Sequence, residues 1–150
     1  MMFQRTNRSD AEKVFIPVLN NEGSAFVAGQ TVQWEPAAAS VDGVRVRDMD
    51  ASNDYLFAGI IDAAIAASAY GLMQVYGYRS DALVFQTGTS VATGVPLVAV
   101  TGQRYLNSYN STLASSTSVT FVPIWGALLE SITDQATSSA RSTKIFIRAM

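Results

Sequence analysis

Residues 42–47 have the sequence DGVRVR, in which a turn signal precedes a strict alternation of valine and arginine. An Asp-Gly pair favours the tight turn of a β-hairpin. Alternation with a period of two places Val44 and Val46 on one face of a strand and the arginines on the other. The stretch therefore predicts a half-buried β-strand that begins at a turn.

Short extended segments with turn residues between them recur along the rest of the chain, which is typical of an all-β domain. We predict strands at residues 14–19, 31–35, 44–47, 72–78, 83–87, 97–101, 119–125 and 144–148. Because a strand buries every second side chain, we expect an inward-facing set consisting of Val32, Trp34, Val44, Val46, Val75, Ile145 and Ile147. The fold class that follows is a compact β-barrel or β-sandwich with short strands and Gly-rich turns.

Two apolar stretches leave a helix open as an alternative. Residues 60–69 hold good helix formers and an i, i+4 pair, Ile61 and Ile65, and residues 128–134 offer a second short candidate. The prolines Pro17 and Pro123 fall inside predicted strands, where they favour an edge or a bulge.

Residues 1–12 are polar and mixed in charge, and we interpret them as an extended N-terminal arm preceding a single β domain at residues 13–150. A faint internal similarity relates residues 27–32 to residues 92–97, because both place a small residue and a glycine before a strand. We interpret this similarity as shared turn chemistry rather than a true repeat.

The composition argues against several classes of function. The chain has 150 residues, of which 15% are charged and 49% hydrophobic, a low charge content for a soluble domain. Histidine and cysteine are absent, so the usual general base near neutral pH and thiolate metal ligands are missing. The net charge of −2 gives no electrostatic footprint for nucleic acid or an anionic membrane, and no apolar run approaches a membrane span. We expect no cofactor.

Residues 48–54 resemble the opening of a calcium loop, with oxygen-bearing side chains at alternate positions. A helical calcium loop needs Gly at its sixth position and Glu at its twelfth, where this chain has Asn53 and Gly59. We therefore interpret the segment as a polar turn without a metal. Asp62 and Glu130 lie in apolar sequence and would suit a glycosidase pair only if they approached each other. We expect no catalytic residues.

The aromatic residues allow two interpretations. They can form core and interface, or a stacking platform for a sugar. The set is Trp34, Tyr70, Tyr76, Tyr78, Tyr105, Tyr109 and Trp125. A platform for RNA would need more basic residues beside the rings than Arg79 and Arg104 provide.

Five segments in order are similar to tailed-phage capsid decoration proteins, also called cement or auxiliary head proteins. They are residues 13–16, 57–62, 69–79, 93–97 and 144–150, while the Ser/Thr-rich residues 107–120 match no part of that group. Each motif consists mostly of glycine and apolar residues, so the order of the segments carries more of the resemblance than any one motif.

The resemblance implies a virion structural protein without an active site, made in the host cytoplasm and placed on the outer surface of the assembled head. It would bind the major capsid protein and bridge neighbouring subunits. It would also contact copies of itself in a symmetric homo-oligomer such as a trimer. We expect the arm to contribute Phe3, Arg5 and Arg8 to partner binding. The rival interpretation is a carbohydrate- or receptor-binding module on a virion, and an enzyme is a third.

Overall fold

The computed structural model describes residues 12–36, 43–49, 56–86, 90–100, 102–109, 123–133 and 139–149. The strands are β1 (Lys13–Asn20), β2 (Thr31–Trp34), β3 (Arg45–Arg47), β4 (Phe57–Ile61), β5 (Tyr70–Gln86), β6 (Pro96–Ala99), β7 (Leu106–Ser108), β8 (Gly126–Leu128) and β9 (Ser139–Arg148). The described residues contain no α-helix, so the predicted all-β class is confirmed. No helix in these ranges has the length and hydropathy that a membrane crossing needs.

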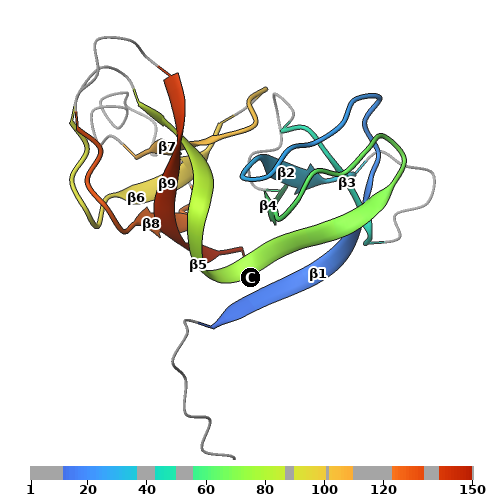
Figure 1. The fold of residues 1–150 in the computed structure, drawn as a ribbon, viewed down its shortest axis with the longest axis horizontal. Coiled ribbons are helices and arrows are strands. Elements are labelled where there is room, and N and C mark those ends of the chain that lie inside the picture. The colour runs from blue at the N-terminus through green and yellow to red at the C-terminus, as the bar shows by residue number, and fades with distance from the viewer. Residues whose placement is uncertain are drawn as a thin grey trace, which may run out of the picture.

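All nine strands belong to one mixed sheet that closes on itself twice. The order is β1-β3-β2-β4-β5-β7-β6-β8-β9, and β5 pairs in addition with β1 and with β9. Strands β1 to β5 therefore form one closed ring, the first barrel, and β5 to β9 form a second barrel. Figure 1 shows β5 as a long bent ribbon that passes from one lobe to the other. Of the predicted barrel and sandwich, the chain forms the barrel, as a pair of small barrels that share a strand.

The two barrels repeat the same pairing pattern. Strand β1 pairs parallel with β3, and β5 pairs parallel with β7, while the other pairings are antiparallel. An isolated bridge between Phe26 and Ile65 has its counterpart between Val91 and Ile132. Each barrel is therefore one copy of a five-strand unit, in which β5 is the last strand of the first unit and the first strand of the second.

This repeat corrects our interpretation of the similarity between residues 27–32 and 92–97. The amide of Gly29 donates to the Ile61 carbonyl at 2.9 Å, and the amide of Gly94 donates to the Leu128 carbonyl at 2.8 Å. Both glycines have a positive φ, 84° and 86°, directly before β2 and β6. The similarity marks equivalent positions in two structural units rather than only a common turn.

Other strand boundaries differ from our predictions in informative ways. Residues 72–78 and 83–87 are not two strands, because β5 continues through them with a register shift between Arg79 and Ala82. A bulge absorbs the break in alternation without ending the strand. Residues 123–125, within the strand predicted at 119–125, are not part of a strand, and the strand here is β8, which begins at Gly126. Residues 119–122 lie outside the described ranges. Strands β4 and β7 were not predicted.

The apolar side chains divide into one core for each barrel. The first core contains Val18, Phe26, Val32, Val46, Ala58, Ile61, Ile65, Met73 and Val75. The second contains Met49, Phe57, Ile60, Ala82, Val84, Leu97, Ala99, Leu106, Leu128, Ile132, Ile145 and Ile147. Each fully buried valine, leucine, isoleucine, phenylalanine or methionine side chain stabilises the fold by about 1.5–3 kcal/mol.

The inward-facing set is confirmed at five positions and only partly at two. Val32, Val46, Val75, Ile145 and Ile147 are buried. Trp34 and Val44 are half-buried, and Trp34 packs against the edge of the first core. Trp34 is the last residue of β2, and Val44 directly precedes β3.

The helix alternative at residues 60–69 is wrong. Ile60 and Ile61 end β4, and the following turn returns the chain so that Ile65 bridges to Phe26. The turn places Ser68 at a positive φ of 58°, which a helix does not allow. Residues 128–132 repeat this arrangement in the second barrel, because Leu128 ends β8 and Ile132 bridges to Val91.

The barrels are also joined away from β5. Arg104, between β6 and β7, makes two contacts of 2.7 Å with the Asp48 carboxylate of the first barrel and lies 5.2 Å from the ring centroid of Phe26. Its guanidinium also donates to Ser24 Oγ at 2.7 Å. The amide of Leu83 donates to the Gly29 carbonyl at 3.0 Å. These contacts fix one barrel against the other.

Candidate protein-binding surface

A row of apolar side chains lies on the outer surface of the first barrel. In the antiparallel β1–β5 pair, Pro17 is opposite Leu72 and Leu19 is opposite Tyr70. Directly opposed residues share a face, and Phe15 joins them because it is two residues from Pro17. We call Phe15, Pro17, Leu19, Tyr70 and Leu72 the β1–β5 face. Residues that alternate with them, such as Val18, point into the core.

This face is exposed despite its apolar composition. Tyr70 is 72% exposed, Leu72 49% and Phe15 37%. With about 150–250 Å² for a fully exposed aromatic side chain, the face offers on the order of 300–400 Å². The largest apolar patch on a monomeric protein has a similar area and is often functional.

The internal repeat supplies a direct comparison for this face. The Leu72 carbonyl accepts from the amide of Asp62, and the Lys144 carbonyl accepts from the amide of Leu129. Leu72 is therefore equivalent to Lys144, and Tyr70, two residues earlier, to Ser142. Both second-barrel residues are exposed. The same two outward positions are thus apolar in one barrel and polar in the other.

The neighbouring strand shows the same contrast. Opposite Leu72, β1 carries Pro17, while opposite Lys144 the bulge of β5 carries Ser80 and Asp81. Ser80 is exposed and the Asp81 side chain is 47% exposed. The five-strand unit therefore folds with polar residues at these places. Because the fold does not require the apolar side chains of the β1–β5 face, contact with another molecule is the better explanation for them.

A buried cation supports the middle of β5, beside its bulge. The Arg79 side chain is 3% exposed, and its guanidinium donates to Asp62 at 3.3 Å and to Asp81 at 3.0 Å. Its Nε is also 3.0 Å from Asp81, although only the Nη2 contact has hydrogen-bond geometry. Buried charges are tolerated when they are paired in this way. Asp62 therefore serves as a counter-ion at the bulge of β5.

Glu130 has a separate partner in the second barrel. The amide of Lys144 donates to Glu130 Oε1 at 2.9 Å, and Lys144 Nζ lies 3.1 Å from Oε2. These contacts, led by the backbone hydrogen bond, lower the pKa of Glu130, and the hydrogen bond to Glu130 raises the pKa of Lys144. Asp62 thus pairs with Arg79, and Glu130 pairs with Lys144 in the second barrel. The two carboxylates therefore do not form the glycosidase pair that their sequence context would have suited.

The Glu130–Lys144 contact predicts a titration that can be measured. The Glu130 carboxyl should titrate below 4.5, and Lys144→Met should move its pKa back toward that value. The shift should be only partly reversed, because the backbone amide at position 144 still donates. A group with a lowered pKa in the folded state stabilises it above the unfolded pKa, and that contribution is lost as the pH falls through the folded pKa. Carboxyl NMR titration of both proteins tests this, and an unchanged Glu130 pKa in the variant would contradict the ion pair.

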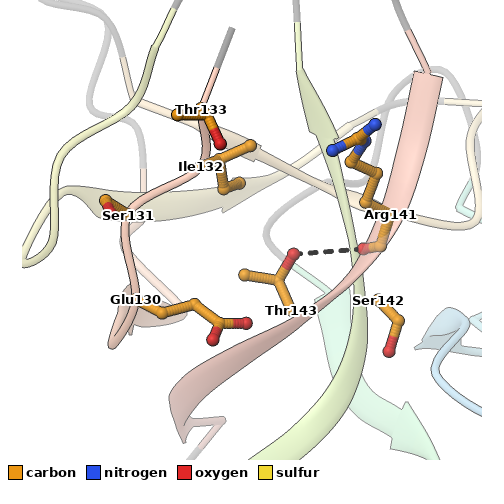
Figure 2. Close-up of a pocket in the computed structure, with 7 residues that line it drawn as sticks. All are labelled: Glu130, Ser131, Ile132, Thr133, Arg141, Ser142 and Thr143. Carbon is orange, nitrogen blue, oxygen red and sulfur yellow. Dashed lines mark hydrogen bonds between the residues drawn. The ribbon is translucent and has the colours of Figure 1, made fainter. Parts of the chain in front are cut away.

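A small pocket lies beside the same residues. Its volume is about 120 Å³, and it is lined by Glu130, Ser131, Ile132, Thr133, Arg141, Ser142 and Thr143. Figure 2 shows the residues after β8 on one side and β9 on the other, with the Thr143 hydroxyl 3.3 Å from the Arg141 carbonyl. Ligand pockets are usually about 300–1,000 Å³, so this space suits at most a very small molecule.

The described aromatic residues do not form one stacking platform. Three ring pairs lie at different places, Phe57–Trp125, Tyr76–Phe146 and Phe85–Tyr105. Lys13 Nζ lies 5.8 Å from the ring centroid of Tyr78. Tyr70 is the aromatic residue with the greatest exposure among those described, and it belongs to the β1–β5 face.

The residues predicted to resemble a calcium loop are only partly described. Asp48 pairs with Arg104, and Asp50–Asp54 lie outside the described ranges. Those ranges hold no group of three or more acidic side chains placed to bind a metal. We expect no calcium to bind, so the melting temperature should be unchanged in millimolar calcium. A bound ion would raise the melting temperature, because a ligand that binds only the folded state stabilises that state. A rise of several degrees that a chelator reverses would contradict this expectation.

The residues predicted to bind partners, Phe3, Arg5 and Arg8, lie outside the described ranges. Sequence reasoning missed the β1–β5 face, although a signal was present. Residues 70–76 read YGLMQVY, so apolar side chains occupy both faces of the strand around Leu72 and Met73. Alternation alone does not show which of two apolar faces remains exposed. Comparison with protein-family models and with curated proteins found no match for the chain.

Proposed function

We propose that the chain is a capsid decoration protein of a tailed phage. It binds the outer surface of the assembled head, bridges major capsid subunits and acts by contact rather than by catalysis. The observation that carries the proposal is the β1–β5 face, an exposed apolar surface that the equivalent strands of the second barrel lack. Such a face is typical of a protein that acts by binding other proteins.

Two further features support this proposal. The five segments that resemble decoration proteins include much of β1, β4, β5 and β9, the strands that close the two barrels. The Arg104–Asp48 ion pair and the Gly29–Leu83 hydrogen bond join the barrels at points distant from β5 in sequence. A framework linked in this way suits a protein that must keep its shape while bridging neighbouring subunits.

Purified particles test the proposal directly. The experiment isolates heads produced by the genome that encodes the chain and quantifies the chain in them by mass spectrometry. We expect many copies per head, and electron microscopy of particles with and without the chain should place the difference density on the outer surface. Absence from purified heads, or density confined to the interior or the tail, would contradict the proposal.

A further inference from the structure

We propose that the small pocket of the second barrel binds one oxyanion group, a phosphate or a carboxylate, through Arg141. The pocket lies between the turn that follows β8 and the first half of β9. Figure 2 shows Glu130 and Thr143 at one end of the space and Arg141 and Thr133 at the other. None of the lining residues belongs to the β1–β5 face, so binding here is independent of any capsid contact made through that face.

The first barrel shows why a space exists at this place. The isolated bridges make Ile65 equivalent to Ile132, and the paired strands make Gly71 equivalent to Thr143. In the first barrel the Ile65 side chain packs so closely over Gly71 that a Cβ at position 71 would overlap it. Thr143 has a side chain at the equivalent place, so Ile132 cannot pack over it in the same way. A space therefore remains beside Ile132.

The lining of the pocket is polar, whereas its counterpart in the first barrel is not. The second-barrel lining has one guanidinium, one carboxylate and four hydroxyls around Ile132. The equivalents of these polar residues carry no charge, and they are Ala63, Ala64, Ala66, Ala69, Tyr70 and Gly71. Because the five-strand unit folds without the polar side chains, recognition of a ligand is the better explanation for them.

The charges around the pocket favour an anion. Arg141 is half-buried, and its guanidinium forms no ion pair with any other residue in the described part of the chain. The Glu130 charge is offset by Lys144, whose Nζ lies 3.1 Å from Oε2. The other Glu130 oxygen accepts from the Lys144 amide at 2.9 Å. The guanidinium is therefore the uncompensated charge of the pocket.

The donors and the volume fit a single small group. A guanidinium binds carboxylate or phosphate oxygens through parallel N–H donors. The Thr143 residue is 2% exposed, and its hydrogen bond to the Arg141 carbonyl is long, 3.3 Å, so the hydroxyl can donate to a bound anion instead. A volume of about 120 Å³ holds one such group, and the lining includes no aromatic ring on which a sugar could stack.

The chain offers variants that separate this site from general surface charge. Arg141→Ala introduces the residue type of its first-barrel equivalent, Ala69. The matched control is Arg148→Ala, which removes an exposed arginine from the same strand but outside the pocket. Thr143→Val keeps the shape of the side chain and removes the hydroxyl, and Glu130→Gln removes the negative charge. Circular dichroism and thermal melting show that each protein is folded.

NMR titration of the backbone amides with sodium phosphate, and separately with sodium acetate, measures binding at constant ionic strength. We expect saturable shifts at residues 131–133 and 141–143, with a dissociation constant on the order of 1 mM for the tighter ion. Arg141→Ala should weaken binding at least about tenfold and Thr143→Val about threefold, while Arg148→Ala should leave it unchanged. Glu130→Gln should strengthen it about two- to fivefold, because a like charge is removed. The tighter of the two ions identifies the group that the pocket prefers.

Four results would overturn the proposal. Shifts that rise linearly with concentration, or that spread over the surface lysines and arginines, would mean an adventitious ion only. Unchanged binding by Arg141→Ala, or an equal loss in Arg148→Ala, would remove the role of the guanidinium. Equal binding of uncharged glycerol would exclude recognition of charge. The presence of the chain on purified heads is measured separately, so this proposal and the proposed function can each fail alone.

Discussion

An assembled shell should bind the chain about 10²–10⁴ times more tightly than a free major capsid subunit does. Under the proposed function, each protomer makes only a modest contact with the head. Protomers that also contact one another bind several sites at once, so every contact after the first becomes effectively intramolecular. The shell presents those sites at fixed spacing, whereas a free subunit presents one.

Co-sedimentation with mature heads, with empty heads and with free subunits measures this ratio. Deleting residues 1–12 should weaken shell binding, because we expect Phe3, Arg5 and Arg8 to contact the head. The domain should remain folded, since the described core begins in β1 and the deletion ends before Lys13. Equal affinity for shells and subunits would refute the avidity argument, and unchanged binding by the truncated chain would refute the role of the arm.

Gly29→Ala should destabilise the protein far more than Gly94→Ala, although the two glycines occupy equivalent positions. Both have a positive φ near 85°, which costs an alanine about 1–2 kcal/mol. A Cβ at position 94 meets no atom within 4 Å, whereas a Cβ at position 29 would lie 2.2 Å from the Asp81 carbonyl oxygen. Relieving that overlap requires the barrels to separate and should add about 1–3 kcal/mol.

Thermal and denaturant unfolding of both variants measure the difference. At this chain length a change of 1 kcal/mol corresponds to about 2–4 °C in the melting temperature. We expect Gly94→Ala to melt a few degrees below the natural chain and Gly29→Ala about 5–15 °C below it. Equal losses would mean that the Asp81 segment moves aside without cost and that the close approach of the barrels is not rigid.

The sequence was most informative where local pattern decides the structure. Alternation around Val46 and Ile145 predicted strands and buried positions because one face of each strand meets a core. Pro17 predicted an edge, and it lies where β1 has a single described strand neighbour. These properties depend on residues close together in the chain, so a single sequence contains them.

Properties that depend on distant residues were not predictable in the same way. The continuity of β5 through Ser80 and Asp81 requires β9 on one side to carry the strand across its bulge. The pairing of β5 with β1 and β4 decides which face of β5 meets the core. In this pairing Met73 is buried in the core, and Tyr70 and Leu72 face solvent. The internal repeat was visible as two glycines, but its meaning required the pairing of β2 with β4 and of β6 with β8.

The shared strand also determines how the molecule carries a mechanical load. At Tyr76 and Gly77 the beginning of β1 lies on one side of β5 and the end of β9 on the other. Pulling residues 12 and 149 apart would drag β1 toward the C-terminal end of β5 and β9 toward its N-terminal end. Both ladders would be loaded in shear, with all their hydrogen bonds strained together instead of one after another. The two ladders should therefore resist tension applied at residues 12 and 149, whereas a pull on the turn before Tyr70 would peel β5 from β1 one bond at a time.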